Sequence, residues 1–268
     1  NPDLVREVLT SIWERREVVE YRDGAGNISS AEKTLRVVEL LAESNGRLSV
    51  ADIAKALDVH ISSADRYLLT LQKLGYAEKD FMTGRFRLTD KLLGLNSMLV
   101  ANHPLTVRYL DIMHTLAYEF NTTAHIMAFY GMETITLHKD LQMQDMAVNG
   151  AFFARTRYHY CSAPGKLLLS TLSEEELCEY FRHTNLIRFT KTTLTTEESI
   201  RANIALIRKR GYSVSDGEWM RGALTISFPL RVSGEIKGAM SIITETENTD
   251  RILAPETIEH IKELLIEP

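Results

Sequence analysis

The chain has 268 residues, of which 44% are apolar and 25% charged, and its formal net charge is −5. This composition is ordinary for a globular protein, and the length exceeds that of a typical single domain. No apolar run approaches the roughly 20 residues needed to span a bilayer, so we expect neither a transmembrane segment nor a membrane partner.

Residues 1–30 are predicted to be an N-terminal extension. Residues 4–21 have the pattern of an amphipathic helix, and residues 23–27 that of a flexible linker. Because its apolar residues are too few to fold alone, the extension should pack on the neighbouring domain or on a partner protomer; a disordered tail is the alternative. It lacks the pattern of a secretory signal peptide, so we expect a cytoplasmic protein.

The next stretch has the pattern of three short amphipathic helices. In the first, predicted over 31–43, apolar residues recur three and four positions apart. They should form one buried stripe: Leu35, Val38, Leu41 and Ala42. Ser49 and Asp52 form an acidic capping box at the start of the second helix, and Ser62 and Asp65 repeat that spacing at the start of the third.

A β-hairpin is predicted after the third helix. Gly75 is suited to end that helix, and residues 76–79 and 85–88 read as two short strands around a turn that contains Gly84. Three helices followed by such a hairpin are typical of a winged helix-turn-helix, in which one helix lies in the major groove of DNA and the hairpin is the wing. We therefore assign residues 31–95 to a DNA-binding domain.

The third helix and the wing carry the candidate DNA contacts. These are polar residues on one side of the helix, together with two arginines that alternate with Phe86 on the wing. They are Ser62, Ser63, Arg66, Thr70, Lys73, Arg85 and Arg87. Arg66 is the leading candidate. Capping alone is the favoured alternative for Ser62 and Asp65, and each arginine has the alternative of being an ordinary solvated side chain.

The charge of this segment predicts an oligomer. Residues 62–91 hold six basic and four acidic side chains, so the segment is only slightly positive within an acidic chain. Few phosphate contacts per protomer give weak binding, because affinity for DNA depends on neutralising phosphates. Useful affinity should therefore require two or more copies acting on a repeated site, as in a homodimer or homotetramer.

The rest of the chain has a mixed pattern. Residues 96–110 should form a linker helix broken near Pro104, and residues 105–268 a second domain. Helices are predicted over 105–120, from Ser173 and over 196–210, and strands over 123–129, 134–138, 223–227 and 238–243. This pattern favours an α+β fold in which helices pack beside a largely antiparallel sheet.

Three segments in this order resemble IclR-type bacterial transcription regulators. They are the run from Lys33 to Leu88, which includes DIAKALDVHISSADRYLLTLQKLGYAEKD and GRFRL, the segment YCSAPGKLLL at 160–169, and residues 211–241, which end in GAMS. The resemblance implies a winged helix-turn-helix domain joined to a GAF-like effector-binding domain. It also implies double-stranded operator DNA and a small-molecule effector as partners, in a dimer or a dimer of dimers.

A candidate effector site lies around residues 162–165. Pro164 suits the first turn of a helix, and free N–H groups at a helix start favour an anion, so a carboxylate-bearing metabolite is our first hypothesis. Close packing of a helix on a sheet is the alternative explanation for these small residues. The resemblance implies that five positions line the ligand cavity: Ala163, Gly165, Ala223, Thr225 and Ser241.

Two positions depart from the pattern of family members that bind small acids. Ser215 stands where those members carry an acidic residue, and Ile243 where they carry a small hydroxyl residue. A cavity with these replacements is less polar. We therefore expect an effector that is larger or more apolar than glyoxylate or pyruvate, such as an aromatic acid.

Other chemistries lack the residues they need. Gly165-Lys166 does not form a phosphate-binding loop, because Tyr160 and Leu167 replace its first glycine and its magnesium-binding hydroxyl. The candidate metal ligands, which lack the spacing of a structural zinc site, are His159, Cys161, Cys178 and His183. Two cysteines also fit a reducing compartment better than a disulfide framework.

We accordingly predict no catalytic residues, no cofactor, no metal and no enzymatic activity. The prediction is a ligand-responsive DNA-binding transcription regulator. The alternative is a metabolite-binding module whose helix-turn-helix serves mainly in dimerisation.

Overall fold

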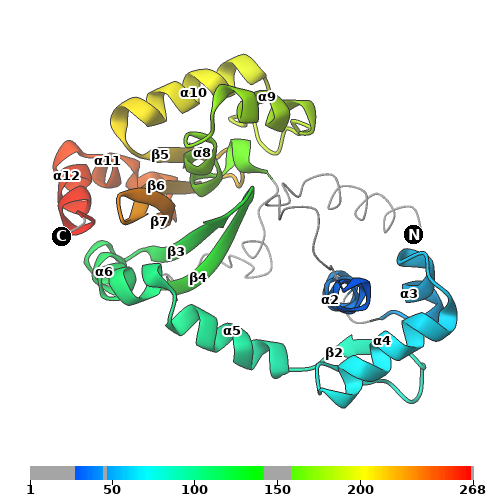
Figure 1. The fold of residues 1–268 in the computed structure, drawn as a ribbon. Coiled ribbons are helices and arrows are strands. Elements are labelled where there is room, and N and C mark those ends of the chain that lie inside the picture. Colours follow the sequence, from blue (N-terminus) through cyan, green and yellow to red (C-terminus); the bar gives the residue numbers. More distant parts are fainter. Residues whose placement is uncertain (1–27, 45–46, 142–157, 267–268) are drawn as a thin grey trace. The chain divides into compact units, whose positions relative to one another are not determined.

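The computed structural model describes residues 28–44, 47–141 and 158–266 (Figure 1). The predicted N-terminal helix over 4–21 lies outside these residues. The chain divides between Met98 and Leu99 into two compact units, each described separately below. Among the described residues, no helix combines the length and the apolar character that a membrane span requires.

The N-terminal unit contains the predicted three helices and hairpin. The helices are α2 (Ser29–Glu43), α3 (Val50–Ala56) and α4 (Ile61–Lys73), and the antiparallel strands are β1 (Ala77–Lys79) and β2 (Phe86–Leu88). Helix α5 (Lys91–Ala101) follows. The three helices and the hairpin enclose one apolar core: Val37, Leu40, Leu41, Ile53, Ala54, Ala64, Leu68, Leu71, Ala77 and Phe86.

The predicted stripe of α2 is partly wrong. Val37 and Leu40 are buried beside Leu41, whereas Leu35 is 67% exposed and Ala42 is also exposed. Both sets of residues have helical spacing, since Val37, Leu40 and Leu41 lie three and four positions apart as well. Only the position of α4 and the hairpin selects which of the two faces is buried.

The predicted cap of α4 is also wrong. His60 is the N-cap, and its Nδ1 accepts the Ser62 N–H at 3.3 Å and lies 2.8 Å from the Ser62 Oγ. Ser62 and Asp65 therefore lie inside the helix. An imidazole nitrogen can accept the same hydrogen bond as a serine oxygen, so the helix begins two residues earlier than the serine pattern indicates. The capping box of Ser49 and Asp52 is confirmed.

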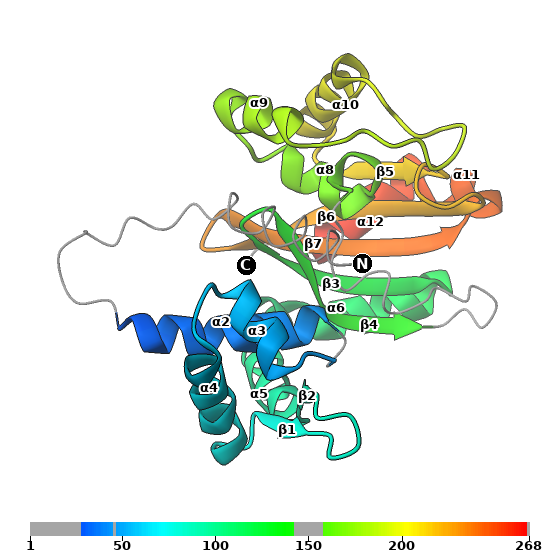
Figure 2. The ribbon, with the colours of Figure 1, turned by 90° about the vertical axis from the view of Figure 1, so that its right-hand side faces the viewer.

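The C-terminal unit is built on a five-stranded antiparallel sheet in the order β4-β3-β7-β6-β5, as Figure 2 shows. The strands are β3 (Thr123–Tyr130), β4 (Glu133–Leu141), β5 (Ser213–Asp216), β6 (Ala223–Val232) and β7 (Glu235–Glu245). The predicted hairpin of β3 and β4 is confirmed, as are strands β6 and β7. This sheet, with helices beside it, confirms the α+β prediction.

Helices cover both faces of this sheet. On one face pack α6 (Pro104–Phe120), α11 (Thr249–Ile252) and α12 (Pro255–Leu264), whose core includes Tyr109, Ile126, Phe228 and Ile258. The other side carries α8 (Ala163–Leu169) and α10 (Glu197–Arg210), where Leu167, Ile207 and Ala239 form a smaller apolar cluster. Helix α9 (Glu174–Arg182) begins with the predicted capping box, and Gly211 ends α10 in the left-handed conformation, as expected.

Gly238 allows the central strands to approach each other closely. A Cβ atom at this position would lie 2.1 Å from the carbonyl oxygen of Met127 on β3 and 2.5 Å from Leu105 Cδ1 of α6. Any side chain would therefore force the sheet away from this helix. Two residues, Asn121 and Thr122, join α6 to β3, and Asn121 has the left-handed backbone conformation with φ 48°.

Candidate functional site

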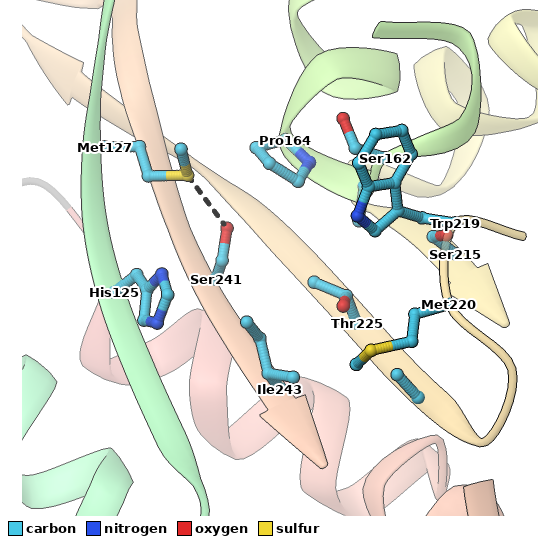
Figure 3. Close-up of a pocket in the computed structure, with 12 residues that line it drawn as sticks. His125, Met127, Ser162, Pro164, Ser215, Trp219, Met220, Thr225, Ser241 and Ile243 are labelled. Atoms are coloured by element: carbon cyan, nitrogen blue, oxygen red, sulfur yellow. Dashed lines mark hydrogen bonds between the residues drawn. The ribbon is translucent and has the colours of Figure 1, made fainter. Parts of the chain in front are cut away.

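The C-terminal unit contains a pocket between α8, strands of the sheet and the loop that joins β5 to β6 (Figure 3). Its empty volume is about 580 Å³, including the opening to solvent. The lining residues are His125, Met127, Ser162, Ala163, Pro164, Ser215, Trp219, Met220, Ala223, Thr225, Ser241 and Ile243.

Six of the seven predicted effector residues line this pocket: Ala163, Ser215, Ala223, Thr225, Ser241 and Ile243. Gly165 does not line it. A Cβ on Gly165 would lie 2.4 Å from His159 Cα and 2.7 Å from the His159 carbonyl oxygen. Gly165 therefore allows α8 to pack against the 3-10 turn over His159–Cys161, which is the close-packing role that the sequence left as an alternative.

The start of α8 offers fewer free N–H groups than the sequence suggests. The Ser162 side chain accepts the N–H of Gly165 at 3.3 Å, and the Ser162 carbonyl accepts that of Lys166 at 2.8 Å. Pro164 has no N–H to offer. Within the described residues, the Ala163 N–H alone in this turn has no assigned hydrogen bond, so hydroxyl groups must supply most of the polar contacts to a ligand.

The residues that sequence reasoning missed fall into two groups. His125 and Met127 lie on β3, and His125 pairs in register with Ser241 of β7, so the alternation of β3 carries a signal for both. Trp219 and Met220 lie on the loop between β5 and β6. No periodic sequence pattern predicts which loop side chains line a pocket, so only the structure could identify Trp219 and Met220 as lining residues.

The pocket is close to neutral. Burial, with a smaller contribution from the nearby Lys139, lowers the pKa of His125 to about 3, so its imidazole is uncharged near pH 7. None of the other described lining residues has an ionisable side chain. Besides His125, the polar side-chain groups are the indole N–H of Trp219 and the hydroxyls of Ser162, Ser215, Thr225 and Ser241, of which Ser215 donates to the Cys161 carbonyl at 2.8 Å.

A buried ion pair supports the loop that carries Trp219. Lys166 of α8 is fully buried, and its Nζ donates a hydrogen bond to Oε1 of Glu218. Burial lowers the pKa of Lys166 and raises that of Glu218, and each charge opposes the change in its partner. The Glu218 carbonyl also accepts the Thr193 hydroxyl at 2.6 Å, so this loop is attached both to α8 and to the segment before α10.

An aromatic cluster continues from Trp219 away from the pocket. The Trp219 ring centroid lies 4.6 Å from that of Phe189 and 5.4 Å from that of Tyr158. Tyr158 and Phe189 are themselves 4.8 Å apart in an edge-to-face arrangement. Such contacts stabilise the orientation of the indole ring that lines the pocket.

The predicted DNA-contacting residues all lie in the N-terminal unit. Ser62, Arg66, Thr70 and Lys73 are exposed along α4, and Ser63 is half-buried. Neither Arg66 nor Lys73 forms an ion pair with another described residue, so both are available to an external anion.

The two wing arginines are exposed but engaged. Arg85 donates to the Arg47 carbonyl and lies 4.0 Å from an Asp52 carboxylate oxygen, and Arg87 pairs with Glu78 at 2.5 Å. Exposed pairs of this kind contribute little to stability and exchange readily for phosphate. Because Arg66 has no ion pair with a described residue to give up, it ranks above Arg85 and Arg87 as a candidate DNA contact.

Comparison with known proteins gives consistent matches across both units. Residues 98–265 match the model of the bacterial transcriptional regulator IclR C-terminal domain, and residues 30–80 that of the IclR helix-turn-helix domain. The Pca regulon regulatory protein of Pseudomonas putida is 26% identical over 84% of this chain and 77% of its own length. The regulator XynR of Escherichia coli is 25% identical over 83% of this chain and 88% of its own.

Solved structures show the same fold. A transcriptional regulator from Rhodococcus sp. RHA1 superposes with a TM-score of 0.70 at 25% identity, covering 89% of this chain and 98% of that one. A homologue from Microbacterium hydrocarbonoxydans, solved in complex with 4-hydroxybenzoate, has a TM-score of 0.69 at 20% identity, covering 88% and 95%. The relatives are regulators rather than enzymes, and the chain belongs to the IclR family of bacterial transcriptional regulators.

Proposed function

We propose that this protein is a ligand-responsive transcription regulator that binds operator DNA through α4 and the wing and senses an aromatic carboxylate in the pocket of its C-terminal unit. The observation that carries the proposal is the composition of that pocket. Its apolar lining includes Met127, Trp219, Met220 and Ile243, and its polar groups are hydroxyls, an indole N–H and a neutral imidazole. Apolar walls with a few polar groups suit a ring that bears one carboxylate.

The carboxylate would be held at the start of α8. The Ala163 N–H and the hydroxyls of Ser162 and Thr225 are the donors that the site offers there. A small oxoacid has little apolar surface to place against Met127, Met220 and Ile243, whereas a benzoate has its ring. The Microbacterium hydrocarbonoxydans homologue, which was solved with 4-hydroxybenzoate, supports this choice of ligand class.

A second copy of the chain is part of the proposal. Helix α5 has no buried residue, and the exposed fractions of Leu93 and Leu99 are 63% and 72%. An apolar helix in this state gains stability by packing against a partner. A dimer or tetramer would present two or more copies of α4 to a repeated operator, and an effector would shift operator affinity by binding one arrangement of those copies more tightly than the other.

Thermal unfolding against a panel of acids tests the ligand class. A ligand present at about 100 times its dissociation constant adds about 2.7 kcal/mol to native stability. We expect stabilisation by benzoate or hydroxybenzoates and less by glyoxylate or pyruvate. Thr225→Val, which removes a hydroxyl at constant volume, should weaken the response, whereas Thr257→Val on α12, which does not line the pocket, should not. High affinity for the small acids alone would refute an aromatic effector.

Duplex binding as a function of salt tests the DNA face. The test duplex is selected by the protein from a random-sequence library, and its binding should weaken steeply as salt rises, because phosphate contacts release counterions. Arg66→Ala should weaken binding by about 1–3 kcal/mol. Arg182→Ala, which changes an exposed arginine of the C-terminal unit, is the matched control. If Arg66→Ala binds as tightly as the wild type, Arg66 is not a DNA contact.

A further inference from the structure

The tip of the wing carries two apolar side chains that pack against almost nothing. Phe81 is 93% exposed and Met82 is 95% exposed, the highest values among the exposed large apolar side chains of the described chain. Neither residue belongs to the core of the N-terminal unit, which instead buries Phe86 of the neighbouring strand. Two adjacent apolar side chains in this state lower the solubility of a monomer unless they meet a partner.

The tip is held in one conformation by its own hydrogen bonds. The Asp80 carboxylate accepts the N–H of Met82 at 2.8 Å, the N–H of Thr83 at 3.3 Å and the hydroxyl of Thr83 at 2.8 Å. The Asp80 carbonyl accepts the N–H of Gly84, which has φ +69°. A turn ordered in this way presents Phe81 and Met82 without the entropy cost of ordering a loose loop on binding.

The surroundings of the tip favour a polyanion as the partner. Lys79 and Arg87 lie on the two strands that lead to it, Arg85 directly precedes β2, and Lys79 forms no ion pair with another described residue. Asp80 stays charged and its oxygens face the donors of the turn, so residues 78–87 carry three basic and two acidic side chains. The hairpin follows α4 directly and belongs to the same compact unit, and its loop projects to one side of that unit (Figure 2).

We propose that Phe81 and Met82 form a wedge that enters the minor groove of operator DNA and inserts between two base pairs, so that binding bends the duplex at that step. Phe and Met are among the apolar side chains that act in this way, because the larger contact surface of bent DNA compensates for unstacking the bases. With α4 in the major groove, the wing would reach the adjacent minor groove. The inference rests on the DNA-binding function proposed above.

The test compares the wild type with the double variant Phe81→Ser and Met82→Ser. Both side chains are exposed, and the main-chain hydrogen bonds of the turn remain, so the variant should fold. The probe is a duplex selected by the wild-type protein from a random-sequence library and labelled at both ends for energy transfer, which reports bending. Tyr130→Ser, at the exposed tip of the β3–β4 hairpin, is the matched control.

We expect the wild type and Tyr130→Ser to bend the duplex, and the wing variant to leave it straight and bind about 10–100-fold more weakly, the range expected for losing base stacking. A variant that binds and bends like the wild type overturns the wedge while leaving DNA binding intact. A variant that changes the oligomeric state also overturns it, because the tip would then contact a second copy. If the wild type selects no duplex, the proposed DNA-binding function itself fails.

Discussion

Lowering the pH should destabilise the C-terminal unit through a single buried imidazole. His125 lies in the floor of the pocket with no exposed surface, and burial lowers its pKa from 6.5 to about 3. Because the folded state binds this proton more weakly than the unfolded state, the stabilising contribution is complete above pH 6.5 and is lost as the pH falls from 6.5 towards 3. The loss approaches about 1.4 kcal/mol per pH unit within that window.

These pKa values predict a measurable change in the free energy of unfolding between pH 8 and pH 5. Between pH 8 and pH 5, the unfolded chain takes up almost one full proton at His125 and the folded chain takes up almost none. The free energy of unfolding should fall by about 2 kcal/mol from this residue alone. The carboxylates contribute their own pH dependence, so a variant that lacks the imidazole is needed to isolate the effect.

Urea unfolding of the full chain at pH 8 and pH 5, followed by circular dichroism, measures this difference. His125→Gln should lose less stability between the two pH values than the wild type, by about 2 kcal/mol. His260→Gln, which changes an exposed imidazole on α12 outside the pocket, is the matched control. If wild type and His125→Gln lose the same stability, His125 is not a buried neutral group and the description of the pocket as uncharged is wrong.

Three further predictions concern packing and reactivity. Glu218→Gln leaves the buried Lys166 charge uncompensated, so the free energy of unfolding in urea should fall by about 3–5 kcal/mol. Replacing both residues by methionine should cost less than the single change. A loss below about 1 kcal/mol for Glu218→Gln would contradict this. Gly238→Ala should cost at least about 1–3 kcal/mol, with Gly94→Ala on exposed α5 as a neutral or stabilising control. In the native protein, iodoacetamide at pH 8 should alkylate exposed Cys178 and spare Cys161, because burial raises the Cys161 pKa to about 12; labelling of both would refute it.

Local patterns predicted the elements whose ends are determined by nearby residues. The capping boxes at Ser49 and Ser173 and the glycine after α10 identify helix ends through contacts within four residues. The hairpin of β3 and β4 follows from alternation around a short turn. The start of α4 was placed wrongly because a histidine accepts the capping hydrogen bond there, which serine-based rules do not anticipate.

The pocket could be predicted only where the family pattern reaches it. Six of its lining residues lie at positions that the resemblance identified, but Gly165 turned out to be a packing residue because its N–H is already bonded and a Cβ would clash with His159. Trp219 lines the pocket on a loop that is held by the ion pair between Lys166 and Glu218, which are 52 positions apart in the sequence. Contacts of such long range depend on how the whole unit packs, and no local pattern records them.

The connection between α6 and β3 has a mechanical consequence. Asn121 and Thr122 alone separate the helix from the strand that contributes His125 and Met127 to the pocket, and the Asn121 and Thr122 N–H groups are both bonded to the last turn of the helix. A connection of two residues whose N–H groups are both hydrogen-bonded has little conformational freedom. Any displacement that a ligand imposes on β3 would therefore act directly on the C-terminal end of α6.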